Sequence, residues 1–345
     1  MHFPDYAMKD EKELNNLENI ILADPESKVW NFANAVYNNI IKIESERSRI
    51  GFALGKVEIR NFPDGEFEPR IIPNTRLKNV VYIQDSSKEP ARWWVEMMLV
   101  NNAARRGSAA SVIDVLPYMR WSRSEKKDKP HIAIASRVFA DTISLSDSGS
   151  RANRVIALDL HAPAILGFFN IPFDALYSYP DIVDYIKTKH PEITDNPIVV
   201  APDTGSTERT RAFAKRIGNN IDIAIIDKRR ISGERVEVYH VVGEVEGKNC
   251  LLIDDILSSG KTLGEAEIAL RKNGAKNVYA YATHFVGSGN YMENLKGLDR
   301  VMTTDTFYQP TEDNLEKIEV ISVAPLFAEA IYRARNGESI SELFQ

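Results

Sequence analysis

The chain has 345 residues, about twice a typical domain, and its hydrophobic fraction of 43% is enough for one or two ordinary cores. Its net charge of −6 excludes a global basic surface for nucleic acid or an anionic membrane, and its single cysteine, Cys250, excludes an intramolecular disulfide and a cysteine-built zinc site. The sequence has no run of about 18 apolar residues and no apolar secretory signal, so we expect a cytoplasmic protein.

Apolar runs rich in β-branched residues alternate with helical patterns along most of the chain. This alternation predicts parallel strands covered on both faces by helices, which is an α/β architecture. The predicted strands cover 79–84, 111–118, 154–160, 197–203, 221–228, 249–255 and 277–284, and the predicted helices cover 90–107, 207–218 and about 262–273.

Both halves contain strand–loop–helix units with polar residues after the strands, so two similar domains are expected. Residues 1–30 are interpreted as a charged N-terminal extension, 31–179 as the first domain and 180–345 as the second. The boundary is placed near Tyr179–Pro180, where a new helix begins. The last helix is expected to pack on the N-terminal domain.

The most informative stretch is LLIDDILSSGKTLGEAEIAL, residues 251–270. Asp254 and Asp255 end an apolar strand, and because a dry interior penalises neighbouring carboxylates we expect both at the strand's carboxyl edge. The next loop offers backbone N–H groups, hydroxyls and a helix N-terminus to an anion. This combination suits a sugar phosphate, with the carboxylates on ribose hydroxyls and the phosphate on Ser258, Ser259, Gly260, Lys261 and Thr262.

Two other readings of this stretch were weighed. Ser258 or Ser259 alone would also serve as the N-cap of an ordinary helix. A Walker A loop is excluded because Asp255 stands where that motif needs its first glycine.

The stretch resembles the PRPP-binding motif of type I phosphoribosyltransferases and of phosphoribosyl pyrophosphate (PRPP) synthetases. Residues 159–174, DLHAPAILGFFNIPFD, resemble a signature of the synthetases alone. The likeness covers roughly residues 50–345. It implies two phosphoribosyltransferase-like (Rossmann-like) domains, the first on the ATP side and the second on the ribose-phosphate side. It also implies that His161 coordinates the Mg²⁺ held by ATP.

Two further segments resemble the ATP side of the family. RNFPDGE, residues 60–66, matches a loop that binds a neighbouring subunit's adenine, which implies stacking by Phe62 and hydrogen bonds to Asp64 and Glu66. The same letters also predict a turn. PYMRWSRSEKK, residues 117–127, matches a segment in which Arg123 is the family's arginine, while Ser124 and Glu125 replace its usual glutamine and aspartate.

Two segments resemble the metal and catalytic loops. APDTGST, residues 201–207, implies that Asp203 serves a second Mg²⁺ or the ribose, although a serine replaces the second glycine. DKRR, residues 227–230, implies that Lys228 and Arg230 are the catalytic cations. Phosphoryl transfer depends on positioning and on cations that neutralise developing charge. The following ISGER is consistent with a lid.

The resemblance therefore implies Mg²⁺-dependent transfer of the diphosphoryl group of ATP to the anomeric hydroxyl of ribose 5-phosphate, giving PRPP and AMP. Lys228, Arg230 and His161 are the catalytic candidates. The expected partners are ATP and ribose 5-phosphate, with no nucleic acid or membrane, in a homo-oligomer such as a dimer or hexamer.

Three alternatives remain at this point. In the first alternative, the acceptor is a larger compound such as ADP-ribose. Two features favour it: Ser258 replaces the family's aspartate, and Lys261 adds a cation. The chain is an inactive synthetase-associated regulatory subunit, which Ser124 and Glu125 favour weakly. A phosphoribosyltransferase is disfavoured by the ATP-side motifs.

Overall fold

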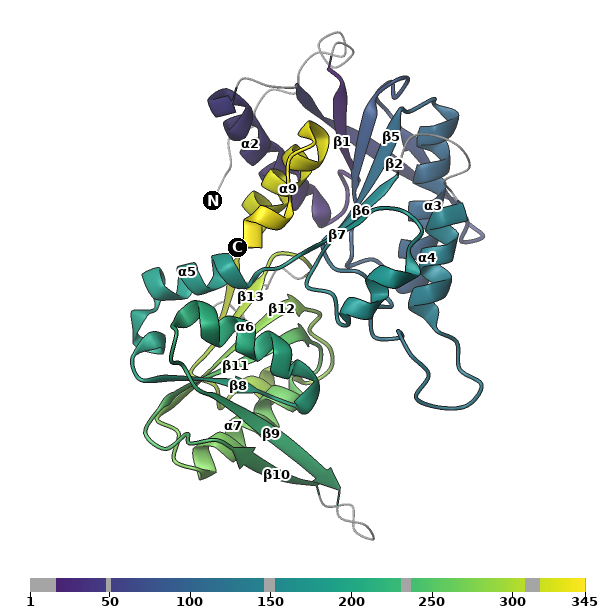
Figure 1. Cartoon of the computed structure of the whole chain (residues 1–345). Coiled ribbons are helices and arrows are strands. Elements are labelled where there is room, and N and C mark those ends of the chain that lie inside the picture. Colours follow the sequence, from purple (N-terminus) through teal and green to yellow (C-terminus); the bar gives the residue numbers. More distant parts are fainter. Residues whose placement is uncertain (1–16, 48–50, 146–152, 231–236, 308–316, 345) are drawn as a thin grey trace. The chain divides into compact units, whose positions relative to one another are not determined.

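The computed structural model describes residues 17–47, 51–145, 153–230, 237–307 and 317–344. The chain forms two compact units, one made of Met1–Leu176 with Val323–Gln345 and the other of Tyr177–Ser322. The division between Leu176 and Tyr177 falls a few residues before the expected one at Tyr179–Pro180. Each unit is a sheet with helices on both faces (Figure 1).

The first unit contains most of the N-terminal half and the C-terminal end of the chain. Its elements are β1 (Asn19–Ala23), α2 (Val29–Arg47), β2 (Phe52–Asn61), β3 (Phe67–Ile71), β4 (Asn79–Ile83), α3 (Pro90–Arg106), β5 (Ser111–Leu116), α4 (Ala135–Leu145), β6 (Arg154–Leu158), η1 (Pro163–Phe168), β7 (Phe173–Leu176), α9 (Ala324–Asn336) and η5 (Ser341–Phe344).

The first sheet has the strand order β3-β2-β1-β4-β5-β6-β7, and every neighbouring pair is parallel except β2 with β3. Helices α2 and α9 pack on one face of this sheet, and α3 and α4 pack on the other (Figure 1). All residues of β1 are buried because it lies inside the sheet with a layer of helices on each side.

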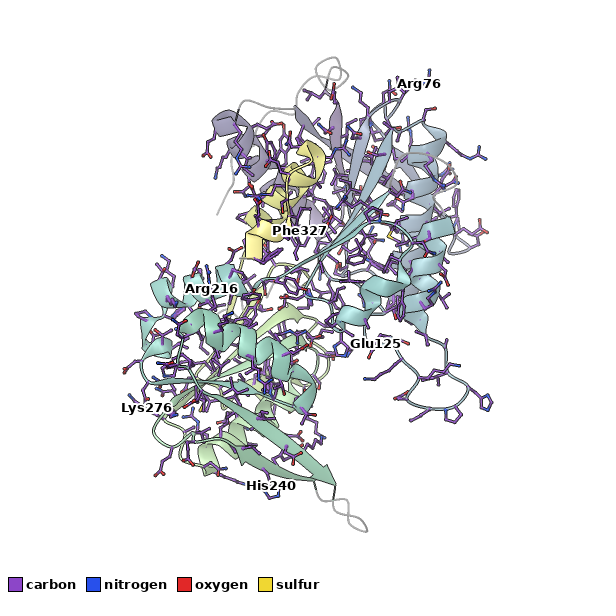
Figure 2. The ribbon with its side chains drawn as sticks, viewed as in Figure 1. Arg76, Glu125, Arg216, His240, Lys276 and Phe327 are labelled. Atoms are coloured by element: carbon purple, nitrogen blue, oxygen red, sulfur yellow. The ribbon has the colours of Figure 1, made fainter. Side chains whose placement is uncertain are left out.

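The two ends of the chain correct the domain limits expected from the sequence. Residues 19–30 are not part of an N-terminal extension, because β1 pairs with both β2 and β4 and α2 begins at Val29. As expected for the last helix, α9 belongs to the first unit, where the ring of Phe327 (labelled in Figure 2) meets that of Phe32 in α2 edge to face at 5.5 Å. The 180–345 segment therefore does not form one domain.

The second unit repeats this plan. Its elements are α5 (Tyr179–Lys189), η2 (Pro191–Thr194), β8 (Pro197–Ala201), η3 (Thr204–Ser206), α6 (Thr207–Ile217), β9 (Ile223–Arg230), β10 (Glu237–Val242), β11 (Asn249–Leu257), α7 (Lys261–Lys272), β12 (Asn277–Phe285), α8 (Tyr291–Leu295), β13 (Arg300–Thr304) and β14 (Ile318–Ile321).

The second sheet has the order β10-β9-β8-β11-β12-β13-β14, with only β9 and β10 antiparallel among its neighbours. Helix α7 covers one face, and α5 and α6 cover the other (Figure 1). Counted along the chain, the strand order is the same as in the first sheet. The expectation of two similar α/β domains with mainly parallel sheets is confirmed.

The strand order also locates the natural ligand edge of each sheet. In the first sheet, β2 and β3 lie on one side of β1, and β4 to β7 lie on the other side. In the second sheet, β9 and β10 lie on one side of β8, and β11 to β14 lie on the other. Ligands of open α/β sheets bind beyond the carboxyl ends of strands at such a reversal. A ligand is therefore expected beyond the carboxyl ends of β1 and β4 in the first sheet, and beyond those of β8 and β11 in the second.

Candidate active site

The acid pair lies beside the reversal point of the second sheet. Strand β11 pairs with β8 only as far as Leu252, and it then continues along β12 to Leu257. Asp254 and Asp255 occupy this continued part. We expected the strand to end at Asp255, so the pair lies inside the strand and not at its last residue. At this point β11 pairs with β12 but not with β8.

The two carboxyl groups lie within hydrogen-bonding reach of each other, although they come from successive residues of the strand. Leu252 shares its core cluster with α7 and Ile253 shares its cluster with α6, so Asp254 leaves the strand on the α7 side and Asp255 on the α6 side. Asp255 is 4% exposed, and Arg209 Nη1 of α6 lies 3.4 Å from its Oδ1. The sequence reading missed this arginine, since no local spacing pairs it with a strand residue 46 positions away.

The pKa of Asp254 is raised by its burial and by neighbouring carboxylates. Burial, and then the charge of Asp255, raise the pKa of Asp254 well above its usual value. Arg209 acts in the opposite direction, and Asp203 adds to the increase. The structure thus brings Asp203, Asp254 and Asp255 into one electrostatic neighbourhood, where a cation or a set of hydroxyl groups would be stabilising.

Asp203 follows β8 and begins the next helical turn. Its Oδ1 accepts the Ser206 N–H at 3.0 Å, and the Ser206 hydroxyl lies 3.2 Å from the same oxygen. Ser206 is buried at the position where the family pattern has a glycine. The substitution therefore fixes the Asp203 carboxylate, which is itself exposed.

The predicted phosphate loop joins β11 to α7. Gly260, at φ 72°, is the N-cap residue of α7 and has no side chain to cap the first turn, so neither Ser258 nor Ser259 occupies the N-cap position. Ser258 Oγ lies 2.9 Å from Ser288 Oγ, and Ser259 Oγ lies 3.4 Å from the Lys261 N–H. A left-handed glycine before an uncapped helix start leaves this end suited to an anion. Thr262 is exposed in the first turn.

Lys228 lies on β9, on the same face as Asp254. Ala224 and Ile226 belong to the α7-facing core, and alternation carries Lys228 to that face. Its Nζ lies 4.0 Å from Glu265 Oε2 and 5.4 Å from the centre of the Tyr239 ring. Arg230 ends the strand, and its side chain is outside what the structure describes, as are residues 231–235 of the expected lid.

In the first unit, Phe62, Asp64 and Glu66 lie at the tip of the β2–β3 hairpin, where Asp64 and Glu66 are exposed and Phe62 is partly buried. The Arg60 guanidinium lies 4.8 Å from the centre of the Phe62 ring. Asp64 Oδ1 accepts the Glu66 N–H at 3.1 Å, and Gly65 has φ 93°. The predicted turn is therefore present, and the Asp64 carboxylate stabilises it.

Arg123, Ser124 and Glu125 lie in the loop between β5 and α4. Arg123 is exposed, whereas Ser124 Oγ accepts the Ala135 N–H at 3.3 Å and its carbonyl accepts the Ser136 hydroxyl at 2.9 Å. Ser124 therefore ties the loop to the start of α4. Glu125, labelled in Figure 2, has a side chain only 9% exposed, with Lys126 Nζ 3.3 Å away.

His161 is exposed just beyond the carboxyl end of β6. Two residues earlier, Asp159 is 8% exposed and has φ 40°, a backbone region that non-glycine residues seldom adopt. Such strain tends to occur at ligand sites. His161 belongs to the first unit, while Asp203, Lys228 and the acid pair belong to the second.

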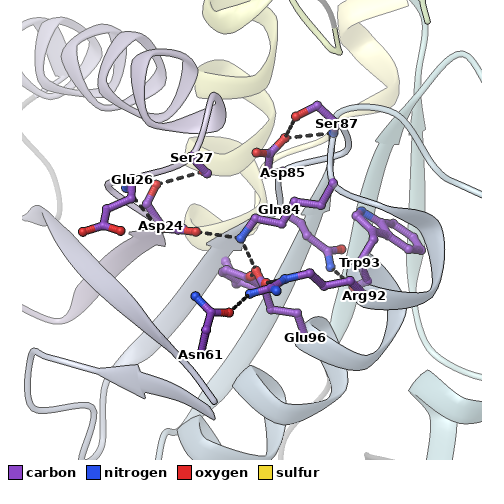
Figure 3. Close-up of polar contacts among 12 residues, drawn as sticks. Asp24, Glu26, Ser27, Asn61, Gln84, Asp85, Ser87, Arg92, Trp93 and Glu96 are labelled. Carbon is purple, nitrogen blue, oxygen red and sulfur yellow. Dashed lines mark hydrogen bonds and ion pairs between the residues drawn. The ribbon is translucent and has the colours of Figure 1, made fainter. Parts of the chain in front are cut away.

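The reversal point of the first sheet carries an ion cluster that the sequence reading did not single out. Lys88, in the loop after β4, lies 2.6 Å from Asp24 Oδ2 and 2.7 Å from Glu96 Oε1. The Tyr82 hydroxyl also donates to Glu96 at 3.1 Å. Figure 3 shows Asp24 and Glu96 around this cluster, with Asp85 bound to Ser87 beside it. At this edge the charged side chains have opposite signs and pair with one another, whereas the acids of the second sheet crowd together.

The fold and these loops define an α/β protein of the phosphoribosyltransferase type, with an acid pair that leads into a loop and the start of a helix. Two family models match the chain: the N-terminal domain of ribose phosphate pyrophosphokinase over residues 31–146, and the phosphoribosyl synthetase-associated domain over residues 228–345. The chain belongs to the ribose-phosphate pyrophosphokinase family.

Individual relatives agree with this assignment. The ribose-phosphate pyrophosphokinase of Caldanaerobacter subterraneus is 40% identical over 89% of this chain and 96% of its own length. That of Chlorobaculum tepidum is 38% identical over 86% and 89%. The crystal structure of phosphoribosylpyrophosphate synthetase from Mycobacterium smegmatis is 27% identical and superimposes with a TM-score of 0.78, covering 93% of this chain and 99% of that one. The expected family and fold are confirmed.

Proposed function

We infer that this chain is a ribose-phosphate pyrophosphokinase, which transfers the diphosphoryl group of ATP to the anomeric hydroxyl of ribose 5-phosphate. The hydroxyl oxygen attacks the β-phosphorus and loses its proton, the bond from that phosphorus to the α-phosphate oxygen breaks, and AMP leaves with PRPP as the other product. The observation that carries this inference is the acid pair of β11 leading into the uncapped start of α7, in a chain that matches named enzymes of this activity over most of its length.

On the ribose side, Asp254 and Asp255 are proposed to accept hydrogen bonds from the ribose hydroxyls. Ser258, Ser259, Gly260, Lys261 and Thr262 are proposed to hold the 5-phosphate, through backbone N–H groups, hydroxyls and one ammonium group. The raised pKa of Asp254 supports this role, because hydroxyl donors relieve the repulsion between the two carboxylates.

On the nucleotide side, Phe62, Asp64 and Glu66 are proposed to bind adenine, together with Arg123, Ser124 and Glu125. The exposure of the hairpin tip supports the first group. Support for Ser124 is weaker, since its hydroxyl already accepts the Ala135 N–H. Lys228, Arg230 and His161 are proposed to stabilise the charge that develops on the transferred group.

Mg²⁺ is the cofactor that this reaction requires in our proposal, with ATP as co-substrate. The oxygen ligands it prefers are present in Asp203 and the crowded acid pair, and His161 is proposed as a further ligand. In the described part of the chain, no three His, Cys, Asp or Glu side chains gather closely enough to hold a metal by themselves. This agrees with an ion that keeps waters and phosphate oxygens as ligands. When bound, Mg²⁺ supplies charge that neutralises the ATP phosphates.

The alternatives are not favoured. The case for ADP-ribose depends on Ser258, which replaces the family's aspartate, and on the extra charge of Lys261. Lys261 Nζ lies 3.5 Å from Glu265 of its own helix, so that charge is already countered. An inactive regulatory subunit would be expected to lose catalytic groups, whereas the acid pair, Lys228 and the anion-binding loop are all present.

We also propose a homo-oligomer in the cytoplasm. A hairpin tip that binds a neighbour's nucleotide would require at least two copies, and the exposed 63–66 segment supports this. Among the described residues, no helix combines the length and apolar character needed to cross a membrane.

The test is AMP and PRPP formation by the purified full-length chain with ATP, Mg²⁺ and ribose 5-phosphate. PRPP is detected by its consumption in a coupled phosphoribosyltransferase reaction. Parallel reactions with ADP-ribose, and without any acceptor, provide the comparison. Absence of AMP release that depends on ribose 5-phosphate would refute the proposed function.

A further inference from the structure

Glu265 forms an unexpected junction on the α7 face of the second unit. It lies one turn into α7, four residues after Lys261 of the phosphate loop. Its Oε1 is 3.5 Å from Lys261 Nζ, and its Oε2 is 4.0 Å from Lys228 Nζ. The Tyr239 hydroxyl donates to the same Oε2. One carboxylate therefore faces a catalytic cation and a phosphate-loop cation together.

The surrounding structure determines this arrangement. Lys228 and Tyr239 are direct partners across the antiparallel β9–β10 pair. The Lys228 ammonium lies near the face of the Tyr239 ring, a cation–π contact, while the Tyr239 hydroxyl reaches Glu265. Glu265 is 24% exposed, compared with 40% for Lys228 and 66% for Lys261, so the acid is the least solvated member. A partly buried carboxylate with a fixed hydroxyl donor is a defined anchor for two flexible lysines.

We propose that Glu265 is a positioning residue that occupies the place of a phosphate in the ligand-free site, holding Lys228 and Lys261 until substrate phosphates displace it. The proposal rests on the function inferred above. Its chemistry is simple: carboxylate and phosphate oxygens compete for the same ammonium groups.

The proposal predicts that Glu265→Gln changes substrate binding but not turnover. Glutamine keeps the size of the side chain and an oxygen that accepts from Tyr239, but it removes the charge that competes with phosphate. Affinity for ribose 5-phosphate should rise by about fivefold, the size expected for the loss of partly exposed ion pairs. Turnover at saturating substrate should stay near wild type, because the substrate phosphates have already displaced Glu265 from Lys228 in that state.

A matched control lies on the same helix. Glu267 pairs with Arg271 at 3.2 Å and faces another part of the unit, so Glu267→Gln removes an ion-paired carboxylate without touching either lysine. It should leave both affinity and turnover near wild type. Circular dichroism and the thermal midpoint of each variant check that the fold is intact.

The experiment is calorimetric titration of the full-length wild type, Glu265→Gln and Glu267→Gln with ribose 5-phosphate and, separately, with inorganic phosphate, followed by steady-state AMP release. Lys261→Met alone and combined with Glu265→Gln completes a double-mutant cycle, in which the affinity gain should shrink when Lys261 is absent. An affinity of Glu265→Gln equal to wild type, or a gain independent of Lys261, would overturn the proposal. The titrations remain decisive if the wild type releases no AMP, a result that would refute only the proposed reaction.

Discussion

Asp114 provides a direct test of how burial controls stability in the first unit. It lies on β5 with no exposed surface, and its Oδ2 accepts Asn101 Nδ2 of α3 at 2.8 Å. Among the described residues, Asp114 Oδ1 and Asn101 Oδ1 have no hydrogen-bond partner. Burial raises the pKa of Asp114 from 3.8 to about 7, with the Asn101 hydrogen bond acting in the opposite direction. The carboxyl group is therefore protonated in the folded protein below neutral pH.

The consequence is a loss of stability as the pH rises. Between about pH 4 and pH 7 the folded state binds a proton at Asp114 that the unfolded state has released, so the free energy of unfolding falls across this window. A pKa difference of about three corresponds to ~4 kcal/mol, reached near pH 7 and constant above it. Asp114→Asn cannot lose the proton and should escape this decline.

The assay is urea unfolding from pH 4 to pH 9, followed by tryptophan fluorescence. All four tryptophans, at 30, 93, 94 and 121, lie in the first unit, so the signal reports the unit that contains Asp114. Asp141→Asn is the control, since that carboxylate is 43% exposed and pairs with Arg137 at the surface. If wild type and Asp114→Asn show parallel pH profiles, the reasoning is wrong.

Three further changes test the site and the packing. Lys228→Ala should raise the activation barrier for AMP release by ~3 kcal/mol, which lowers the rate roughly a hundredfold, with a smaller effect on substrate affinity. A turnover near wild type would contradict the role assigned to Lys228. Phe327→Ala should destabilise the first unit by about 3 kcal/mol, because it removes a buried ring that packs on Phe32; an unchanged unfolding midpoint by tryptophan fluorescence would show that α9 does not stabilise this unit. Gly264→Ala places a Cβ atom 2.2 Å from the Asn294 carbonyl oxygen, so α7 and α8 must separate at a cost of about 2 kcal/mol. A thermal midpoint equal to wild type would contradict that close approach.

Local sequence patterns were sufficient for the architecture and for most candidate residues. Strand and helix periods depend on neighbours within a few positions, so the alternation of apolar runs and helices predicted the parallel α/β plan. The elements at 79–83, 90–106 and 277–285 lie within a residue or two of the prediction. The strand with the acid pair and the helix after the next loop also lie where the sequence placed them, while anion binding by that loop stays a prediction.

Tertiary structure alone decided which distant residues meet. Nothing in the letters 19–23 shows that they form a central strand between β2 and β4. The pairing of Arg209 with Asp255 and of Lys228 with Glu265 depends on strand order and on which helix covers which face. Such contacts join residues tens of positions apart, and their energies become available only after the chain has closed those loops. The sequence therefore determined the kinds of chemical groups at the site, and the fold determined the partners that set their charge.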